Sequence, residues 1–251
     1  MKKKFLVITN NDNVWLKPSW ARVIKKLEEE FEFFIITVPE KKIKNKHAVF
    51  YYLFSFGFFN FLLLTLFSVL RILKYFRVNI KTINAGNSID LEHFDPRRIQ
   101  QYINSYGPDY IFITCSYIIP KTLLSTFNKT PWFNKHASLL PKAKGVFPYI
   151  FNYLNNDKQG ISFHFVTDDV DSGDIIFSKE IEVGKSMVMF YKEVYNNFDR
   201  YFIEFFKNYE LGIKHSQISK GTYFTYPDKK TINNFQKLGG KVIVLEDLLN
   251  V

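Results

Sequence analysis

Short runs rich in β-branched and aromatic residues recur along the chain, and longer segments with helical spacing of apolar residues separate them. Strands are expected in the runs FLVIT, FEFFIITV, NIKTIN, DYIFITCS, WFNKHA, GISFHFVT and IIFSKEIEV, and helices near residues 18–30, 48–76, 95–106 and 146–157. Asp95 followed by Pro96 is typical of a helix start, and Gly107 is typical of its end. Strands and helices in alternation predict the α/β class, with a Rossmann-like, doubly wound and mostly parallel sheet.

A long amphipathic helix is expected from about residue 186 to 211. Its apolar positions recur at helical spacing and are expected in the core: Val188, Tyr191, Val194, Tyr195, Phe198, Phe202, Phe205 and Phe206. With 251 residues and 47% hydrophobic content, the chain is long enough for one well-filled core. We expect one α/β domain over residues 1–212 and a small extension over residues 213–251. The extension should hold a strand pair around GTYFTYP and a short helix, and it could form a contact between the subunits of a dimer.

Residues 48–70 carry no charge over 23 positions. By length this run meets the criterion for a membrane span, and Arg71, Lys74 and Arg77 follow it as cationic anchors would. The run also occupies the place of the crossover helix between the second and third strands, and Gly57 and Asn60 favour a break into two helices. We favour buried or self-associating helices, ahead of interfacial contact with a membrane and of a true span.

Three residues on two separate segments suit acyl transfer to an amine. Asn134 and His136 lie two apart in WFNKHA, so in an extended strand their side chains point to the same face. The next residues, SLLPKAKGVFP, disfavour a helix, which puts both side chains near the carboxyl end of the strand, where open α/β sheets bind ligands. Asp171 follows the strand GISFHFVT and can meet the histidine only if the two strands end at the same edge.

These residue types fit the chemistry of a carbonyl group under attack by an amine. An amide N–H donor and an imidazolium can hold the negative charge that grows on the oxygen, and one such donor is typically worth about 2.7–4 kcal/mol. A histidine oriented by a carboxylate can move the proton of the amine, which contributes about 10²- to 10⁴-fold. His164, in SFHFV, is more typical of a core histidine. Each residue alone has an ordinary structural explanation, and their shared spacing favours a site.

FNKHASLLPKAKGVFP and HFVTDDVDSGDII closely resemble the signature of the formyltetrahydrofolate-dependent formyltransferases. This family includes glycinamide ribonucleotide, methionyl-tRNA and nucleotide-sugar formyltransferases. The resemblance covers residues 108–183 and implies that Asn134 and His136 polarise the formyl oxygen while Asp171 orients the imidazole. It also implies N10-formyltetrahydrofolate as the co-substrate and no metal. The residues that it implies for folate binding are Tyr117, Ile118, Ile119, Pro120, Leu139, Thr167, Asp168 and Asp169.

Differences within the family favour the amino group of a nucleotide-linked amino-deoxysugar, for example a dTDP-linked one, as the acceptor, in the synthesis of surface polysaccharide such as O-antigen. FLVITNNDNVWLKPSW lacks the glycine-rich phosphate loop of the glycinamide ribonucleotide enzymes. About 68 residues follow Val183, too few for the additional barrel domain of methionyl-tRNA enzymes, and the tail resembles the short extension of sugar formyltransferases. Candidate sugar contacts are Asn10, Asn11, Trp15, Lys81 and Asn84. A glycinamide ribonucleotide or methionyl-tRNA enzyme, and an inactive scaffold of a membrane glycan-assembly complex, remain alternatives.

The net charge of +10 is spread along the chain without a recognition helix or an aromatic RNA-binding motif. We therefore expect anionic small molecules, a nucleotide pyrophosphate and a folate tail, and no nucleic acid. The single cysteine, Cys115, excludes an internal disulfide and a cysteine-rich metal site, and inert packing in a strand is expected for it. We expect a homodimer in the cytoplasm, with peripheral contact to the inner face of the membrane if residues 48–70 touch it.

Overall fold

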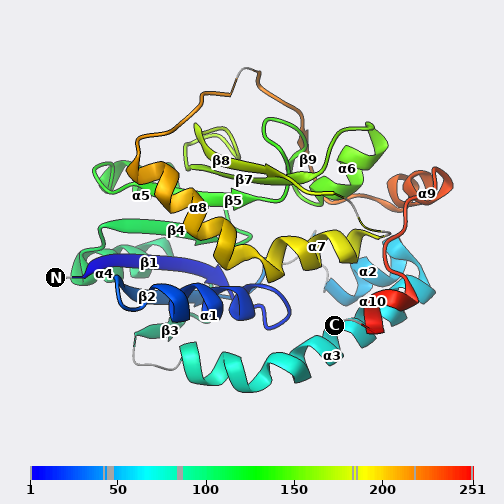
Figure 1. Ribbon diagram of the computed structural model, residues 1–251, viewed down its shortest axis with the longest axis horizontal. Coiled ribbons are helices and arrows are strands. Elements are labelled where there is room, and N and C mark those ends of the chain that lie inside the picture. The colour runs from blue at the N-terminus through cyan, green and yellow to red at the C-terminus, as the bar shows by residue number, and fades with distance from the viewer. Residues whose placement is uncertain are drawn as a thin grey trace.

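The structure is a computed structural model of the chain. It describes residues 2–41, 43, 48–83, 87–182, 184, 186–217, 219–249 and 251, and for residues 48 and 77–83 the backbone alone. A seven-stranded sheet runs through the molecule, with helices on both faces (Figure 1). The predicted α/β class with a doubly wound, mostly parallel sheet is confirmed.

The strands of the sheet follow the order β3-β2-β1-β4-β5-β7-β8. The first five in this order are mutually parallel, whereas β7 is antiparallel to both β5 and β8. The strand order reverses between β1 and β4, the kind of switch point at which open α/β sheets bind ligands. The bounds are β1 Lys3–Asn10, β2 Phe31–Val38, β3 Ser88–Asp90, β4 Tyr110–Thr114, β5 Trp132–His136, β7 Gly160–Phe165 and β8 Ile175–Glu180.

Successive residues of one strand belong to two different hydrophobic cores, because side chains alternate across a sheet. Phe5 and Val7 of β1 lie in the core with α1, α7 and α8, whereas Leu6 and Ile8 lie in the core with α4 and α5. The bounds of these helices, and of α6, are α1 Leu16–Leu27, α4 Pro96–Tyr106, α5 Lys121–Thr126, α6 Pro148–Leu154, α7 Met187–Asn196 and α8 Phe198–Glu210. The caps predicted for α4 are present, since Asp95 accepts from two backbone N–H groups and Gly107 is left-handed.

The predicted helix from 186 to 211 is two helices, because Asn197, at φ −105° and ψ 12°, interrupts it between α7 and α8. Six of its eight predicted core residues are buried. Tyr191 and Tyr195 lie at the edge of the core, where they are only partly buried.

The predicted strand NIKTIN is wrong where it is described. Residues 79–83 form the end of helix α3, Phe58–Ile83, and the third strand is β3 instead. Asn84 lies outside the described residues. No glycine or proline stands between Arg71 and Ile83, so the helix of the apolar run continues through the residues whose composition suggested a strand.

The uncharged segment forms two helices, α2 (Ala48–Phe56) and α3, which confirms the predicted break. Gly57 stands between them in the left-handed region, at φ +82°. By length and composition the stretch Phe58–Phe76 could cross a membrane, and 11% of it is buried in the molecule. Burial of this helix in the core is therefore a wrong prediction, whereas self-association and membrane contact stay predictions.

The C-terminal extension packs on the rest of its own chain. Its strand β9, Tyr223–Phe224, pairs in parallel with β6, Lys144–Gly145, so this strand has its partner outside the extension and not in the predicted strand pair. Gly145 permits the pairing, because a Cβ there would lie 2.2 Å from the carbonyl oxygen of Phe224. Helix α9 (Lys229–Lys237) contacts α2 and α6, and α10 (Leu245–Leu249) contacts α3. The domain boundary at residue 212 stays a prediction.

Candidate active site

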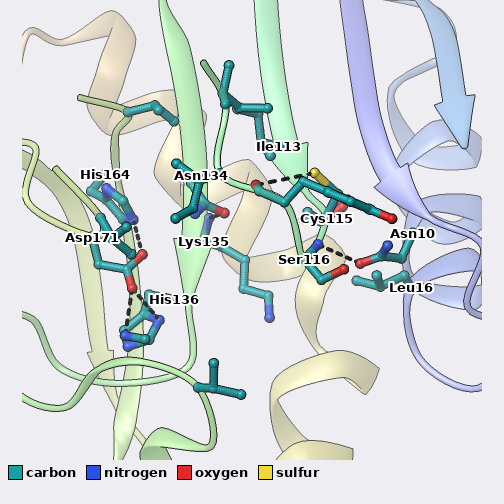
Figure 2. A pocket seen from close by; sticks show the side chains of 18 of the residues that line it. Asn10, Leu16, Ile113, Cys115, Ser116, Asn134, Lys135, His136, His164 and Asp171 are labelled. Carbon is teal, nitrogen blue, oxygen red and sulfur yellow. Dashed lines mark hydrogen bonds and ion pairs between the residues drawn. The ribbon is translucent and has the colours of Figure 1, made fainter. Parts of the chain in front are cut away.

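A cavity of about 430 Å³ opens at the carboxyl ends of β1, β4 and β5, where the strand order crosses from β1 to β4 (Figure 2). The end of β1, the loop after β4, the end of β5 and the loop 166–171 line it. We call it the first cavity. Asn134, His136 and Asp171 all contribute to its wall, so the structure brings together the three residues that the sequence singled out.

Strand β5 presents Asn134 and His136 to the cavity from positions two apart. The side-chain oxygen of Asn134 accepts the backbone N–H of Lys135 at 2.7 Å, which fixes the rotation of the amide. Lys135 also lines the first cavity, although the sequence did not single it out. Its Nζ donates to the hydroxyl of Tyr195 at 2.9 Å and lies 4.2 Å from the centre of that ring.

Asp171 reaches His136 by an unexpected route. Strands β5 and β7 are antiparallel, and Phe165 at the end of β7 pairs with Phe133, so the two strands end at opposite edges. The prediction that Asp171 can meet His136 only if both strands end at the same edge is therefore wrong. The loop after β7 folds back along the paired strands and carries Asp171 to His136. Gly173 allows this turn, since a Cβ there would lie 2.0 Å from the carbonyl oxygen of Phe165. The result is a carboxylate oxygen of Asp171 3.4 Å from Nδ1 of His136.

Two imidazoles share the Asp171 carboxylate. Nε2 of His164 lies 3.5 Å from Oδ1, while Oδ2 faces His136 and accepts the N–H of Gly145 at 2.9 Å (Figure 2). His164 is buried as expected of a core histidine, yet it also lines the cavity. Asp171 itself is left-handed, at φ +51°, a conformation that costs a non-glycine residue roughly 1–3 kcal/mol and is held here by these contacts.

The electrostatics of the group favour an ionised Asp171. Burial would raise the pKa of its carboxyl group, but the His136 and His164 imidazoles and the N–H of Gly145 outweigh burial and hold this pKa well below its usual range. Burial lowers the pKa of His136, and the Asp171 carboxylate opposes that shift. Burial thus favours the neutral form of His136, and the Asp171 carboxylate stabilises the protonated form.

The proton positions on His136 follow from its partners. Nε2 lies 2.8 Å from the carbonyl oxygen of Ala143, an acceptor only, so Nε2 carries the proton when this bond forms. Nδ1 faces the Asp171 carboxylate, which is also an acceptor, so the two contacts together suit the imidazolium form of the ring. They also fix the orientation of the ring beside the first cavity.

Six of the residues implied for folate binding line the first cavity: Tyr117, Ile118, Ile119, Thr167, Asp168 and Asp169. An ion pair of 2.6 Å between Lys121 and Asp168 joins their two loops. Pro120 and Leu139 do not belong to the lining. Pro120 caps α5, and the side chain of Leu139 packs where Gly160 lacks one.

The predicted sugar contacts are divided. Asn10 and Trp15 line the first cavity, whereas Asn11 is exposed outside the lining. The amide of Asn10 already accepts from the backbone N–H of Ser116 at 2.7 Å (Figure 2), and the indole of Trp15 stacks on Tyr195. These contacts leave both residues less available to a ligand than the sequence suggested.

The remaining two predicted sugar contacts cannot be placed against the cavity. Only the backbone of Lys81 is described, in α3, and Asn84 lies outside the described residues.

A second cavity of about 550 Å³ adjoins the first, and residues common to both walls include Lys135, His136, Gly145, Tyr195 and Tyr223. The lining of the second cavity is rich in tyrosine and includes residues that sequence reasoning missed: Lys41, Tyr191, Tyr223, Thr225 and Tyr226. Helical spacing predicts Tyr191 and Tyr195 in the core, and the position of the tail tyrosines predicts a subunit contact. The signal that could have found them is the excess of hydroxyl-bearing aromatic residues at both places.

No group of three or more His, Cys, Asp or Glu suited to a metal ion occurs among the residues that the structure describes. The wall of the first cavity contains the Asn134 amide, the His136 and His164 imidazoles and the Asp171 carboxylate.

Comparison with known proteins gives this arrangement a family context. Residues 80–195 match the family model described as formyl transferase. The curated methionyl-tRNA formyltransferase of Finegoldia magna is 31% identical over 114 residues, which are 45% of this chain and 34% of that protein. The chain spans about a third of the length of the curated relatives that it matches.

Solved structures share the fold. A sugar N-formyltransferase from Shewanella sp has a TM-score of 0.59 at 16% identity, over 89% of this chain and 77% of that one. The formyltransferase PseJ from Anoxybacillus kamchatkensis, in complex with UDP-4,6-dideoxy-4-formamido-L-AltNAc and tetrahydrofolate, has a TM-score of 0.54 at 19% identity, over 96% of this chain and 100% of that one. The fold is that of the α/β formyltransferases, and the predicted resemblance to the formyltransferases is confirmed.

Proposed function

We propose that this chain, whose residues 80–195 match the formyl transferase family model, transfers a formyl group from N10-formyltetrahydrofolate to the amino group of a nucleotide-linked amino-deoxysugar. One observation carries the proposal. His136, with the Asp171 carboxylate 3.4 Å from its Nδ1, stands in the wall that two adjoining cavities share. One cavity can hold the formyl donor and the other the acceptor, with the base between them.

The geometry supports a direct transfer. The acceptor nitrogen attacks the formyl carbon, a new C–N bond forms, and the bond from that carbon to N10 of the folate breaks. Asn134 is positioned to donate from its side-chain amide to the formyl oxygen, where negative charge grows. His136 takes the proton of the attacking amine, and Asp171 stabilises the imidazolium. The proton then passes to N10, which leaves as the amine of tetrahydrofolate.

The start of α1 argues against a phosphate group bound at that helix N-terminus, where a glycinamide ribonucleotide would place one. The carboxyl group of Asp12 accepts the backbone N–H groups of Val14, Trp15 and Leu16 at 2.7, 3.1 and 3.2 Å. Free N–H groups at a helix N-terminus are what usually receives a phosphate, and here the chain's own carboxyl group occupies them. This supports the sugar acceptor over glycinamide ribonucleotide.

The second cavity supports a sugar nucleotide. Its tyrosines offer ring faces and hydroxyl groups, which suit a deoxysugar with apolar and polar edges, and Lys41 and Lys135 bring positive charge for a pyrophosphate. The complex of PseJ with a UDP-linked formamido sugar and tetrahydrofolate is a precedent for both ligands on this fold. We extend the proposal to a role in surface polysaccharide synthesis, in the cytoplasm, by a homodimer.

Methionyl-tRNA is the second candidate acceptor, because the curated relatives act on it by name. The net charge of +10 is compatible with RNA. The two acceptors predict opposite results in one experiment. The purified chain is incubated with N10-formyltetrahydrofolate and either nucleotide-linked 3-amino and 4-amino sugars, glycinamide ribonucleotide or methionyl-tRNA, and products are read by mass spectrometry.

A gain of one formyl group on an amino sugar, lost in a His136→Asn variant, is the expected result. Formylation of methionyl-tRNA alone would overturn the sugar acceptor while keeping the chemistry. No formylation of any acceptor by a folded protein would favour the inactive scaffold.

A further inference from the structure

Helix α3 presents an uninterrupted apolar face to its outside. Six large side chains on this face are exposed: Phe58, Phe59, Leu62, Leu66, Leu73 and Phe76. Phe59 is 80% exposed and Leu73 67%, values that are unusual for such residues in a folded domain. We call this set the outer face of α3. The neighbouring α2 extends it, since its Phe50 and Phe54 are also more than half exposed.

Arg71, the charged residue within the apolar part of α3, lies on the inner side of the helix. Phe67 and Arg71 are fully buried against the body of the molecule. The guanidinium of Arg71 donates to the carbonyl oxygen of Val14 at 2.6 Å and to the side chain of Asn196 at 2.7 Å. The only charge between residues 48 and 73 thus points inward and anchors the helix, which lies along the edge of the molecule (Figure 1).

The charges that flank the apolar residues all have one sign. Apart from the inward-pointing Arg71, residues 41–89 contain seven cations, four lysines within residues 41–46 followed by Lys74, Arg77 and Lys81, and no Asp or Glu. These seven make up most of the net charge of +10. An apolar stripe between two cationic clusters is the pattern of helices that lie in the interface of an anionic membrane.

We propose that the outer face of α3, with α2, binds the surface of an anionic phospholipid bilayer, with the helix lying in the plane of the interface. A second copy of the chain is the competing occupant. In a symmetric dimer through this face, the flanking cations of one copy would meet those of the other without any acidic partner from residues 41–89. The charge pattern therefore favours anionic lipid. This proposal is independent of the acceptor of the formyl group.

Vesicle flotation of the full chain tests the proposal. We expect binding to phosphatidylcholine vesicles that contain phosphatidylglycerol to exceed binding to pure phosphatidylcholine by at least about tenfold, and to weaken with salt. The double variant Phe59→Ser, Leu73→Ser should lose at least about tenfold in binding. The matched control is Leu211→Ser, Leu238→Ser, which removes two leucines that are 66% and 63% exposed on other elements and should bind as the wild type does.

A second readout does not need a destabilising change. In a Phe59→Trp variant, brominated lipids in the vesicles should quench the new tryptophan, whereas a Trp placed at Leu211 (Leu211→Trp) should not be quenched. Absence of wild-type flotation with anionic vesicles, equal binding by the Phe59→Ser, Leu73→Ser variant, or equal quenching at both positions would overturn the proposal. A dimer that the same double variant dissociates, without vesicle binding, would assign the face to a second copy.

Discussion

The role of the Asp171 carboxylate gives the sharpest test of the site. The change is Asp171→Asn, which keeps the size of the side chain and an oxygen that can accept the N–H of Gly145. It removes the negative charge next to Nδ1 of His136, and little else. The pKa of Asp171 is held well below its usual range, so the wild-type group is ionised throughout the pH range of an assay.

The expected loss can be worked from one distance. Across the 3.4 Å between Oδ2 and Nδ1, a carboxylate and an imidazolium attract each other by about 5 kcal/mol at an effective dielectric constant of about 20. This is an upper bound, since the asparagine dipole and water replace part of it. It corresponds to roughly 10³- to 10⁴-fold in rate, in line with the range of about 10²- to 10⁴-fold for a positioned acid or base.

The assay is steady-state formylation of the amino sugar, with kcat and KM for the folate measured separately. We expect kcat to fall by roughly 10²- to 10⁴-fold with a small change in KM. Asp174→Asn is the matched control, because Asp174 lies in the same loop and accepts from Ser216 away from the cavity. A folded Asp171→Asn protein whose kcat stays within about tenfold of the wild type would refute the proposed stabilisation of the imidazolium.

Three further predictions address stability and reactivity. Gly145→Ala should destabilise the chain by more than the roughly 1–3 kcal/mol of a strained backbone, because the new Cβ would also meet a carbonyl oxygen of β9. The control is Gly212→Ala, since Gly212 is also left-handed but has open space around it, and urea unfolding measures both free energies. Burial lowers the pKa of His136, so the unfolded chain binds more protons and the free energy of unfolding should fall as pH drops below about 6.5. It should fall again below about 3.9, because the pKa of Asp171 is also lower in the folded chain, and His136→Asn should remove only the first decline. Burial raises the pKa of Cys115 to about 11, so a thiol reagent at mildly alkaline pH should react with it far more slowly in the folded than in the unfolded chain, and equal rates would contradict the structure.

The sequence predicted helix ends and strand faces correctly where contacts between residues near in the sequence determine them. Asp95, Pro96 and Gly107 set the ends of α4 because the capping bonds lie within a few residues of each other. Gly57 set the break between α2 and α3 for the same reason. Asn134 and His136 share a cavity because alternation along a strand is a local property.

The predictions failed for features that depend on packing between segments far apart in the sequence. The direction of β7 relative to β5 depends on the whole sheet, so the condition for the meeting of Asp171 and His136 could not be read from their segments. The exposure of α3 was missed because an apolar run looks alike in a core and at a surface, and only the fold shows that Arg71, and not Phe59, turns inward. The acid-free stretch from 41 to 89 was in the sequence, and it would have weighed against a buried helix.

The C-terminal extension contributes contacts to the site that the sequence did not predict. Strand β9 pairs with Gly145, whose N–H donates to the Asp171 carboxylate, and Gln217 donates to the main-chain oxygens of Asp171 and Gly173. The strained turn at Asp171 is thus also held by Gln217, from the extension that the sequence assigned to a subunit contact. Tyr223 of the same strand lines both cavities. The extension therefore supports Asp171 and lines the cavity proposed for the acceptor, so we expect a change of acceptor within this fold to involve the tail as well as the sheet.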